Sequence, residues 1–147
     1  MDIGSKAGYP ASALSNFAPH KFIFDGVECA SMEGFLQSLK FKSPEMQKEV
    51  CKLVGKAAKF KGKRKNWRVT QTLYWKGKEY KRDSDEYQEL LDNAYISLFN
   101  QSESFRNALK ATGSSSITHS IGKNKINETV LTQTEFCSRL LKLRNWL

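Results

Sequence analysis

Apolar residues in the second half of the chain recur three or four positions apart, which is the spacing of a buried stripe along one face of a helix. The stripe consists of Tyr87, Leu90, Leu91, Ala94, Tyr95, Leu98 and Phe99. Asp83 or Ser84 is a suitable first cap for this helix, which is expected to end near Asn100. A shorter helix is expected from Ser102 to just before Gly113, because a glycine suits the left-handed residue that ends many helices.

The last helix has the clearest start signal in the chain. Thr132 and Glu135 have the T-x-x-E spacing of a capping box, in which each side chain accepts a hydrogen bond from the backbone of the other residue. Leu131 and Phe136 stand at the two positions of a hydrophobic staple. The sequence therefore predicts a helix that begins at Thr132, after a loop over residues 113–130.

The first half alternates short β-prone runs with helical segments. Residues 21–24 and 27–29 flank an Asp-Gly turn, and residues 73–75 and 78–80 flank a Lys-Gly turn, so each pair predicts a hairpin. Ser31 caps a helix with an apolar face, and a second helix is expected to begin at Ser43 and to end at Gly55. The apolar face of the first helix carries Met32, Phe35, Leu36 and Leu39. The strands are too few and too short for a doubly wound sheet. The whole pattern predicts an α+β fold, mostly helical, as one domain over residues 1–147.

Composition supports a folded and soluble protein. The aromatic share of 12% is that of a globular chain, because disordered chains lack aromatic residues. No apolar run approaches the length of about 20 residues that spans a bilayer, and the N-terminus has no apolar export segment, so we expect a cytoplasmic location without membrane contact. Cys29, Cys51 and Cys137 define neither a disulfide framework nor a zinc site and are expected to be reduced, buried thiols.

The charge is strongly positive and unevenly distributed. The formal net charge is +9, and residues 50–78 contain ten Lys and Arg residues without a single acid. A surface of this kind binds a nucleic acid backbone by releasing its counterions, or it is a solvated face that keeps the protein soluble. The nucleic-acid interpretation assigns backbone contacts to Lys59, Lys61, Lys63, Arg64 and Lys65.

The helix that begins at Ser31 carries polar residues that can line one side of an active site. Glu33, Gln37 and Lys40 are spaced i, i+4 and i+7, which places them in one narrow arc beside the apolar face. Glu33 lies in the first turn, where the positive end of the helix dipole favours an ionised carboxylate. A residue at that position is often only a surface acid that complements the dipole.

The motif around this helix resembles the signature of the NADAR family of N-glycosidases. The matching elements are Ser-Asn-Phe at 15–17, a hairpin with Asp-Gly, and Ser-x-Glu-x-x-x-Gln-x-x-Lys-Phe at 31–41. The resemblance continues more loosely to the last helix. In the riboflavin-intermediate branch an Asp and a Trp-Gly pair precede that helix, whereas this chain has Thr-His-Ser-Ile-Gly at 118–122.

The resemblance implies hydrolysis of a ribosyl N-glycosidic bond. The sequence has no Walker A motif, Rossmann glycine pattern, H-x-x-x-H zinc pair or EF-hand loop, so we expect no metal or nicotinamide cofactor. Glu33 then stabilises the cationic anomeric carbon or activates water, and Lys40, His119 or a protonated Glu128 protonates the departing base. The expected substrate-binding residues are Ser15, Asn16, Phe17, Gln37, Trp67, Trp75 and Thr118. Phe17 and Trp67 equally suit a hydrophobic core, Trp75 beside its Lys-Gly turn is harder to bury, and His119 equally suits a hydrogen bond to the backbone.

Two substrate classes follow from the resemblance: riboflavin-pathway nucleotides, and ADP-ribose attached to guanine in nucleic acid. The basic stretch favours the second, with DNA as partner and reversal of a toxin or defence modification as the role. In a phage or mobile element this would be counter-defence. A binding module for ADP-ribose or nucleic acid, without catalysis, is the alternative from another class. The sequence gives no oligomeric state.

Overall fold

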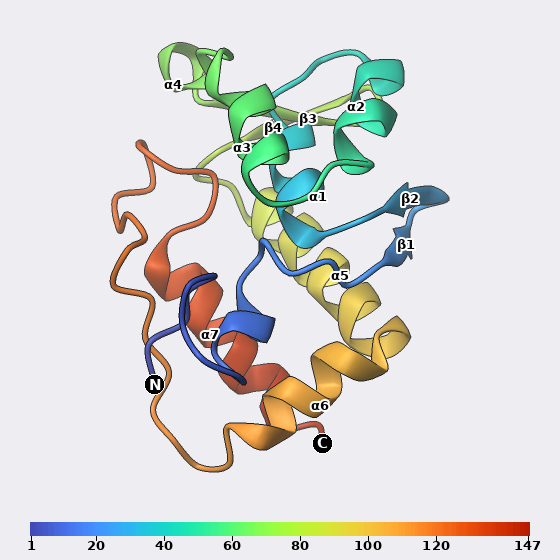
Figure 1. Cartoon of the computed structure of the whole chain (residues 1–147). Coiled ribbons are helices and arrows are strands. Elements are labelled where there is room, and N and C mark those ends of the chain that lie inside the picture. Colours follow the sequence, from blue (N-terminus) through green and yellow to red (C-terminus); the bar gives the residue numbers. More distant parts are fainter.

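The fold is built around one long helix, α5 (Asp85–Gln101), whose apolar stripe is buried along its whole length. The computed structural model describes all residues, 1–147. Figure 1 shows the first four helices and the second hairpin gathered at one end of α5, and α6 (Glu103–Ala111) and the N-terminal segment at the other end. The last helix, α7 (Gln133–Arg144), runs beside α5, from a contact with Gln88 near the start of α5 to the packing of Trp146 on Phe99 near its end. One hydrophobic cluster of 30 buried residues includes side chains from both ends, so the two groups of elements share a core.

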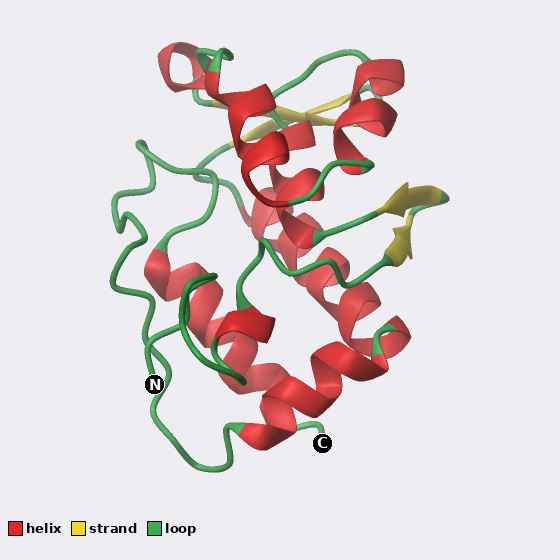
Figure 2. Ribbon diagram, in the orientation of Figure 1, coloured by secondary structure: helices red, strands yellow, loops and turns green.

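Strands contribute little to the architecture, as Figure 2 shows. β1 (Phe22–Phe24) pairs antiparallel with β2 (Val27–Cys29), and β3 (Thr72–Trp75) pairs antiparallel with β4 (Lys78–Lys81). The two hairpins form separate two-stranded sheets. The prediction of an α+β, mostly helical fold with short hairpins is therefore confirmed.

The helix starts that the capping residues predict agree with the structure. Ser31 caps α1 (Met32–Ser38), Ser43 caps α2 (Pro44–Cys51), and Ser84 and Ser102 cap α5 and α6 through bonds to backbone amides. Thr132 and Glu135 form the complete capping box of α7. Local hydrogen bonding therefore sets these boundaries.

The prediction that Gly55 ends the second helix is wrong. α2 ends at Cys51, and Gly55, with a positive φ of 54°, is the first residue of α3 (Gly55–Lys63). α4 (Trp67–Thr70) follows, and a 3-10 turn, η1 (Ser12–Leu14), precedes the first hairpin. The sequence of α3, Gly-Lys-Ala-Ala-Lys-Phe-Lys-Gly-Lys, buries only Ala58 and Gly62, so no apolar periodicity marks it as a helix.

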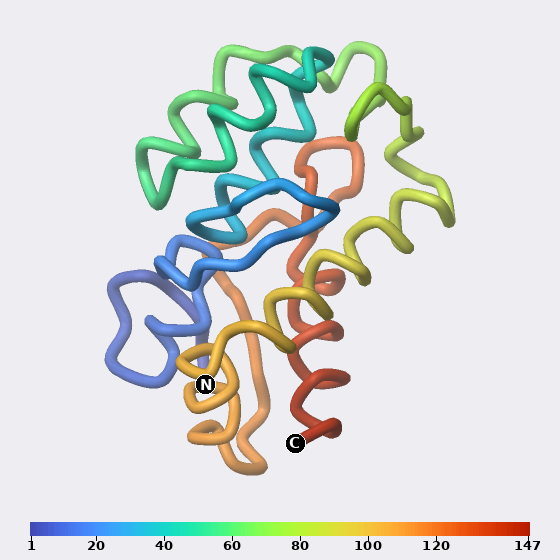
Figure 3. The backbone as a smooth tube through the Cα atoms, turned by 90° about the vertical axis from the view of Figure 1, so that its right-hand side faces the viewer, coloured from blue at the N-terminus to red at the C-terminus, as the bar shows by residue number.

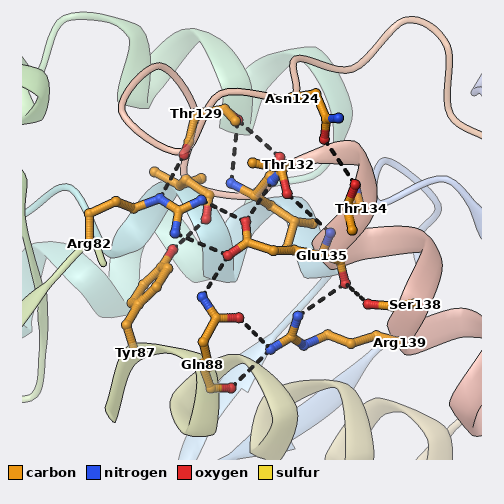
Figure 4. A network of polar contacts seen from close by, with 12 residues as sticks. Arg82, Tyr87, Gln88, Asn124, Thr129, Thr132, Thr134, Glu135, Ser138 and Arg139 are labelled. Atoms are coloured by element: carbon orange, nitrogen blue, oxygen red, sulfur yellow. Dashed lines mark hydrogen bonds and ion pairs between the residues drawn. The ribbon is translucent and has the colours of Figure 1, made fainter. Parts of the chain in front are cut away.

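A long loop over residues 112–132 connects α6 to α7 and climbs along the molecule toward the end that holds α3 and α4 (Figures 1 and 3). Its last part is fixed by a buried polar network, shown in Figure 4. Arg82 donates to Glu135 at 3.0 and 2.6 Å and to the carbonyl oxygen of Thr129 at 2.8 Å, and the hydroxyl of Tyr87 donates to the carbonyl of Val130 at 2.6 Å. None of the helices combines the length and the hydropathy that a membrane span requires.

Candidate active site

Three chain segments meet at the beginning of α1. The hydroxyl of Ser31 accepts a bond of 3.1 Å from the amide of Gly34 and donates one of 3.0 Å to the carbonyl of Leu53. The amide of Glu33 donates to the carbonyl of Asn16 at 2.9 Å. The first turn of α1, with Glu33 in it, is therefore held by the loop before β1 and by the turn after α2.

Gly34 allows the close approach of these segments. A Cβ atom at this position would lie 2.6 Å from the carbonyl oxygen of Leu53 and 3.0 Å from those of Val50 and Cys51. A larger residue would have to move backbone atoms, which pack tightly there. The glycine inside the motif thus has a packing role that fixes the direction of Glu33.

Glu33 is half-buried, and its electrostatic state differs from the expectation based on the helix dipole. Burial raises the pKa of the Glu33 carboxyl above its ordinary value, while the Gln37 side chain and the charges of Lys40 and Lys59 oppose that rise. Desolvation therefore outweighs the stabilisation that a first helical turn gives to an anion. A carboxyl group with a raised pKa suits general acid or base chemistry better than a fully solvated one.

Lys40 lies one turn beyond α1 and is the nearest cation to Glu33 in sequence. Burial lowers the pKa of the Lys40 ammonium, Glu33 raises it, and the positive charges of Arg68, Lys123 and Lys59 lower it further. Lys40 and Lys59 thus act on the Glu33 carboxyl, and Arg68 and Lys123, from two further segments, act on Lys40. A polar site of this composition has an excess of positive charge and favours an anionic ligand.

Gln37 is buried behind Glu33. Its Oε1 has no hydrogen-bond partner, and it packs so closely on α3 that a Cβ at Gly62 would lie inside its contact distance. Gly62 therefore makes room for Gln37, whose side chain also lowers the pKa of Glu33. Arg68, Lys123 and Gly62 were not among the predicted site residues, because nothing local in the sequence connects them to α1.

The Ser15-Asn16-Phe17 loop is fixed by α5 and α3. The hydroxyl of Tyr95, a buried α5 residue, donates to Oδ1 of Asn16 at 2.7 Å. Ser15 is buried and its hydroxyl accepts from the amide of Phe17 at 3.2 Å. The half-buried Phe17 ring lies next to Gly55, where a Cβ would be in van der Waals contact with it. Asn16 thus faces Tyr95 with its side chain and Glu33 with its carbonyl.

An open hollow of about 360 Å³ adjoins this loop. Its lining consists of Ser5, Ser12, Ala13, Phe17, Ala18, Pro19 and His20. Phe17 belongs both to the lining of this hollow and to the Ser15-Asn16-Phe17 loop, which contacts the start of α1. No group of three or more His, Cys, Asp or Glu side chains is arranged to hold a metal ion.

Two of the predicted residues lie where the long loop meets the N-terminus. Thr118 is exposed, and its hydroxyl bonds to Asp2 at 2.9 Å. One ring nitrogen of His119 bonds to the carbonyl of Ile3 at 2.8 Å, and the ring packs edge-on against Phe136. The structure thus gives His119 the backbone hydrogen bond that was its alternative interpretation.

Glu128 is exposed in the same loop and is not among the groups that shift the pKa of Glu33 or Lys40. The backbone next to it is held to the end of α4, because the side chain of Gln71 donates to the carbonyl of Asn127 at 3.0 Å. A role of Glu128 in the site stays a prediction.

The two predicted tryptophans are core residues. Trp67 is 6% exposed and Trp75 is 4% exposed, so the expectation that Trp75 resists burial is wrong. Its indole nitrogen donates to Asp25 at 2.9 Å, and its ring packs against Phe24 and Phe35. Phe24 and Asp25 of the first hairpin both contact Trp75, and these contacts explain how a tryptophan beside a turn becomes buried.

The predicted basic residues divide into two groups. Lys59 influences both Glu33 and Lys40 and so belongs to the site. Lys61, Lys63, Arg64 and Lys65 are exposed on or after α3. Arg64 lies over the ring of Phe60 at 5.8 Å, and Lys65 lies over the ring of Phe41 at 5.0 Å.

The fold is similar to that of a known solution structure. The NMR structure of the Escherichia coli protein YbiA matches 99% of this chain and 83% of its own length, with a TM-score of 0.64 and 17% sequence identity. YbiA is a NADAR-family protein, so this similarity supports a NADAR-like fold.

Sequence comparison gives the family. An uncharacterised 17.1 kDa protein from the Gp30–rIII intergenic region of Enterobacteria phage T4 is 37% identical over 151 residues, covering 100% of this chain and 98% of the relative. The family model described as bacteriophage protein GP30.3 matches residues 8–145. With nearly the whole length matched, the chain belongs to the bacteriophage protein GP30.3 family.

Proposed function

We propose that this protein is an N-glycosidase that removes ADP-ribose from guanine in nucleic acid. The observation that carries the proposal is the half-buried carboxyl group of Glu33, whose pKa is raised by burial and which interacts with Lys40 and Lys59, while Arg68 and Lys123 act on Lys40. The NADAR-like fold supports hydrolysis of an N-glycosidic bond, and the excess positive charge suits a substrate with phosphate groups.

In the proposed reaction a water molecule attacks the anomeric carbon of the ribose while the bond to the guanine nitrogen breaks. The transition state is positive at that carbon, so the carboxylate form of Glu33 stabilises it, and the same group takes a proton from the water. The departing base needs a proton. Among the candidates Lys40 interacts with Glu33 and has a lowered pKa, so it is the assigned donor.

The remaining cations serve the phosphates. The pyrophosphate of ADP-ribose carries two negative charges. The three positive charges of Lys59, Arg68 and Lys123 exceed the single negative charge of Glu33, so the site attracts these phosphates. Asn16, held by Tyr95, is at the right place to orient the sugar beside Glu33. In a bacteriophage family, removal of such a modification would protect DNA from a host defence that adds it.

The substrate is tested by presenting both classes to the same preparation. The protein is incubated with an oligonucleotide that carries ADP-ribose on guanine and, separately, with nucleotide intermediates of riboflavin biosynthesis. Release of free ADP-ribose and unmodified guanine, detected by mass spectrometry, is the expected result for the first substrate only. Turnover of the riboflavin intermediates alone would replace the proposed substrate.

A matched variant separates an enzyme from a binding module. Glu33→Gln keeps the size and hydrogen-bonding capacity of the side chain but cannot ionise. An enzyme loses turnover in this variant and retains ligand binding, which isothermal titration with ADP-ribose measures. A wild-type protein that binds ADP-ribose and releases nothing from the modified oligonucleotide would instead be a binding module.

A further inference from the structure

An aromatic ring stands exposed in the middle of the most basic helix. Phe60 is 62% exposed, although every other phenylalanine of the chain is buried or half-buried. Lys56 and Lys63 stand one turn before and after it on the same face of α3, and the guanidinium group of Arg64 lies over its ring. Single exposed apolar residues are common, but this one is surrounded by cations.

The cations near Phe60 have no acidic partners in the protein. The ion pairs of the structure are Lys52–Glu49, Lys76–Asp25, Arg82–Glu135 and Arg139–Asp92, so none includes a residue between 53 and 75. The chain supplies no acid between residues 50 and 78. The charge on this face is therefore available to an external polyanion.

The helix α3 also reaches the candidate active site. Successive residues of a helix are about 100° apart, so Lys59 and Phe60 lie one residue apart on different sides of α3. Lys59 acts on Glu33 and Lys40, while Phe60 is directed to solvent. A ligand that touches Glu33 and continues over α3 would pass from Lys59 to Phe60.

From this arrangement we infer that the outer face of α3 is a docking surface for single-stranded nucleic acid, with Phe60 as the platform on which one base stacks. Lys56, Lys63 and Arg64 contact the phosphates on either side of that base. The inference rests on the proposed function for the position of the reacting nucleotide, which would lie at Glu33.

The ring selects single strands over duplexes. In a duplex the faces of the bases are covered by their neighbours, and only the phosphates are accessible to a convex helix surface. An unpaired base offers a free face to an aromatic side chain, and this contact tolerates any base. The lysines alone would bind both forms by charge, so the phenylalanine carries the distinction.

Binding of unmodified oligonucleotides tests the inference without any turnover. A fluorescently labelled 12-nucleotide single strand of mixed sequence, made as DNA and as RNA, is titrated with the protein, in parallel with the corresponding duplex. We expect tighter binding of the single strand.

Phe60→Ala weakens that binding by about 5- to 100-fold and leaves duplex binding almost unchanged, since stacking on one base contributes a factor of this size. Phe60→Trp retains the affinity. Preference of the wild type for one sugar identifies the natural strand as DNA or RNA.

The charge contacts have their own measurement and control. Lys63→Gln is expected to reduce the slope of log affinity against log salt by about 0.7, the value for one phosphate contact to a single strand. Lys110→Gln changes an exposed lysine on α6, which belongs to no ion pair, and leaves that slope unchanged. Tyr9→Ala removes an aromatic ring of similar exposure, 66%, outside the basic stretch, and leaves the affinity unchanged.

The possible results distinguish this inference from the proposed function. Equal affinity of the wild type and Phe60→Ala for the single strand, with unchanged thermal unfolding, overturns the stacking platform even if ADP-ribose is released normally. Equal binding of duplex and single strand also overturns it. A strong effect of Phe60→Ala on binding, in a protein that shows no glycosidase activity, leaves the platform intact and refutes the proposed function alone.

Discussion

The hydroxyl of Tyr95 donates a hydrogen bond of 2.7 Å to Oδ1 of Asn16 and so connects the central helix α5 to the loop that holds the start of α1. The same Asn16 accepts from the amide of Glu33 through its carbonyl oxygen. Burial raises the pKa of the Tyr95 hydroxyl well above its usual value, so the group remains a donor at every pH of interest. The core of the protein therefore sets the position of the candidate catalytic carboxylate, Glu33.

Replacing Tyr95 by phenylalanine removes this connection and little else. The Tyr95→Phe variant is expected to lose about 1–2 kcal/mol of unfolding free energy, because Asn16 loses a partner in a half-buried position. We expect kcat to fall by about tenfold or more while the affinity for ADP-ribose changes less, since the loop still forms. Tyr80→Phe is the control, because the Tyr80 hydroxyl makes no hydrogen bond within the protein. A kcat equal to that of the wild type would show that Asn16 is positioned without Tyr95.

Glu33→Gln is expected to reduce turnover and to increase stability at the same time. If Glu33 acts as proposed, turnover falls by about 10²- to 10⁴-fold, the usual contribution of a general acid or base. The carboxyl pKa is raised in the folded protein, so the stability that Glu33 contributes is present below its ordinary pKa and is lost as pH rises through the raised value. Above the raised pKa the ionised side chain therefore opposes folding.

Thermal unfolding between pH 4 and pH 8 measures this effect. The difference in Tm between Glu33→Gln and the wild type should grow as pH increases through the raised pKa and then become constant. A lower Tm for the variant at pH 7 would mean that the ionised carboxylate is stabilised by its neighbours more than burial opposes it, contrary to the direction of the pKa shift.

Asp2 fixes the long loop to the N-terminus. Its Oδ1 accepts from the amide of Ser120 at 2.8 Å and from the hydroxyl of Thr118 at 2.9 Å, and its Oδ2 accepts from the hydroxyl of Ser120 at 2.6 Å. The Ser120 hydroxyl, the Ser120 amide and the Thr118 hydroxyl lower the pKa of Asp2 to about 2. This loop also carries Lys123 toward Lys40.

Loosening that attachment should affect substrate binding more than chemistry. Asp2→Asn retains one acceptor oxygen and loses the charge, so we expect faster hydrogen exchange over residues 118–123 and a KM for the modified oligonucleotide several-fold higher, with a smaller change in kcat. Because the folded pKa is lowered, the contacts of the wild type persist above about pH 4 and weaken as pH falls toward 2. The amide resonance of Ser120 should report this titration by NMR. An amide that titrates near pH 4 would show that the bonds are not formed in solution.

Capping residues made much of the fold predictable, because their effect is local. Ser84, Ser102 and Thr132 each accept a bond from a backbone amide three residues later, and each helix begins where the sequence indicates. Hairpin turns are local in the same way: Asp25 and Lys76 both have a positive φ beside a glycine. By contrast α3 buries Ala58 and Gly62 against other elements, and no pattern within its nine residues reveals that contact.

The candidate site was predictable only where one element supplies it. Glu33, Gln37 and Lys40 share one helix and the turn after it, so spacing alone groups them. Arg68 and Lys123 come to Lys40 through the paths of α4 and the long loop, which depend on tertiary packing. Burial, which depends on tertiary packing, decides whether an aromatic residue can bind a ligand. Trp75 has a ring suited to stacking on a base, but two phenylalanines and Asp25 cover it.

The buried ion pair between Arg82 and Glu135 should dominate the stability of the long loop. Arg82 is 1% exposed and binds both carboxylate oxygens, and burial of Glu135 is outweighed by Arg82 and the Thr132 amide, so the pKa of Glu135 is lowered. Arg82→Met leaves the carboxylate without its partner, and we expect a loss of about 3–5 kcal/mol in urea unfolding. Adding Glu135→Gln removes the unpaired charge and retains a capping side chain, so the double variant should recover most of that loss.

Because the folded pKa of Glu135 is lowered, the wild type loses stability as pH falls through that pKa, whereas the double variant lacks that contribution. A double variant no more stable than Arg82→Met would show that the bond from Arg82 to the Thr129 carbonyl, rather than the ion pair, holds the loop in place.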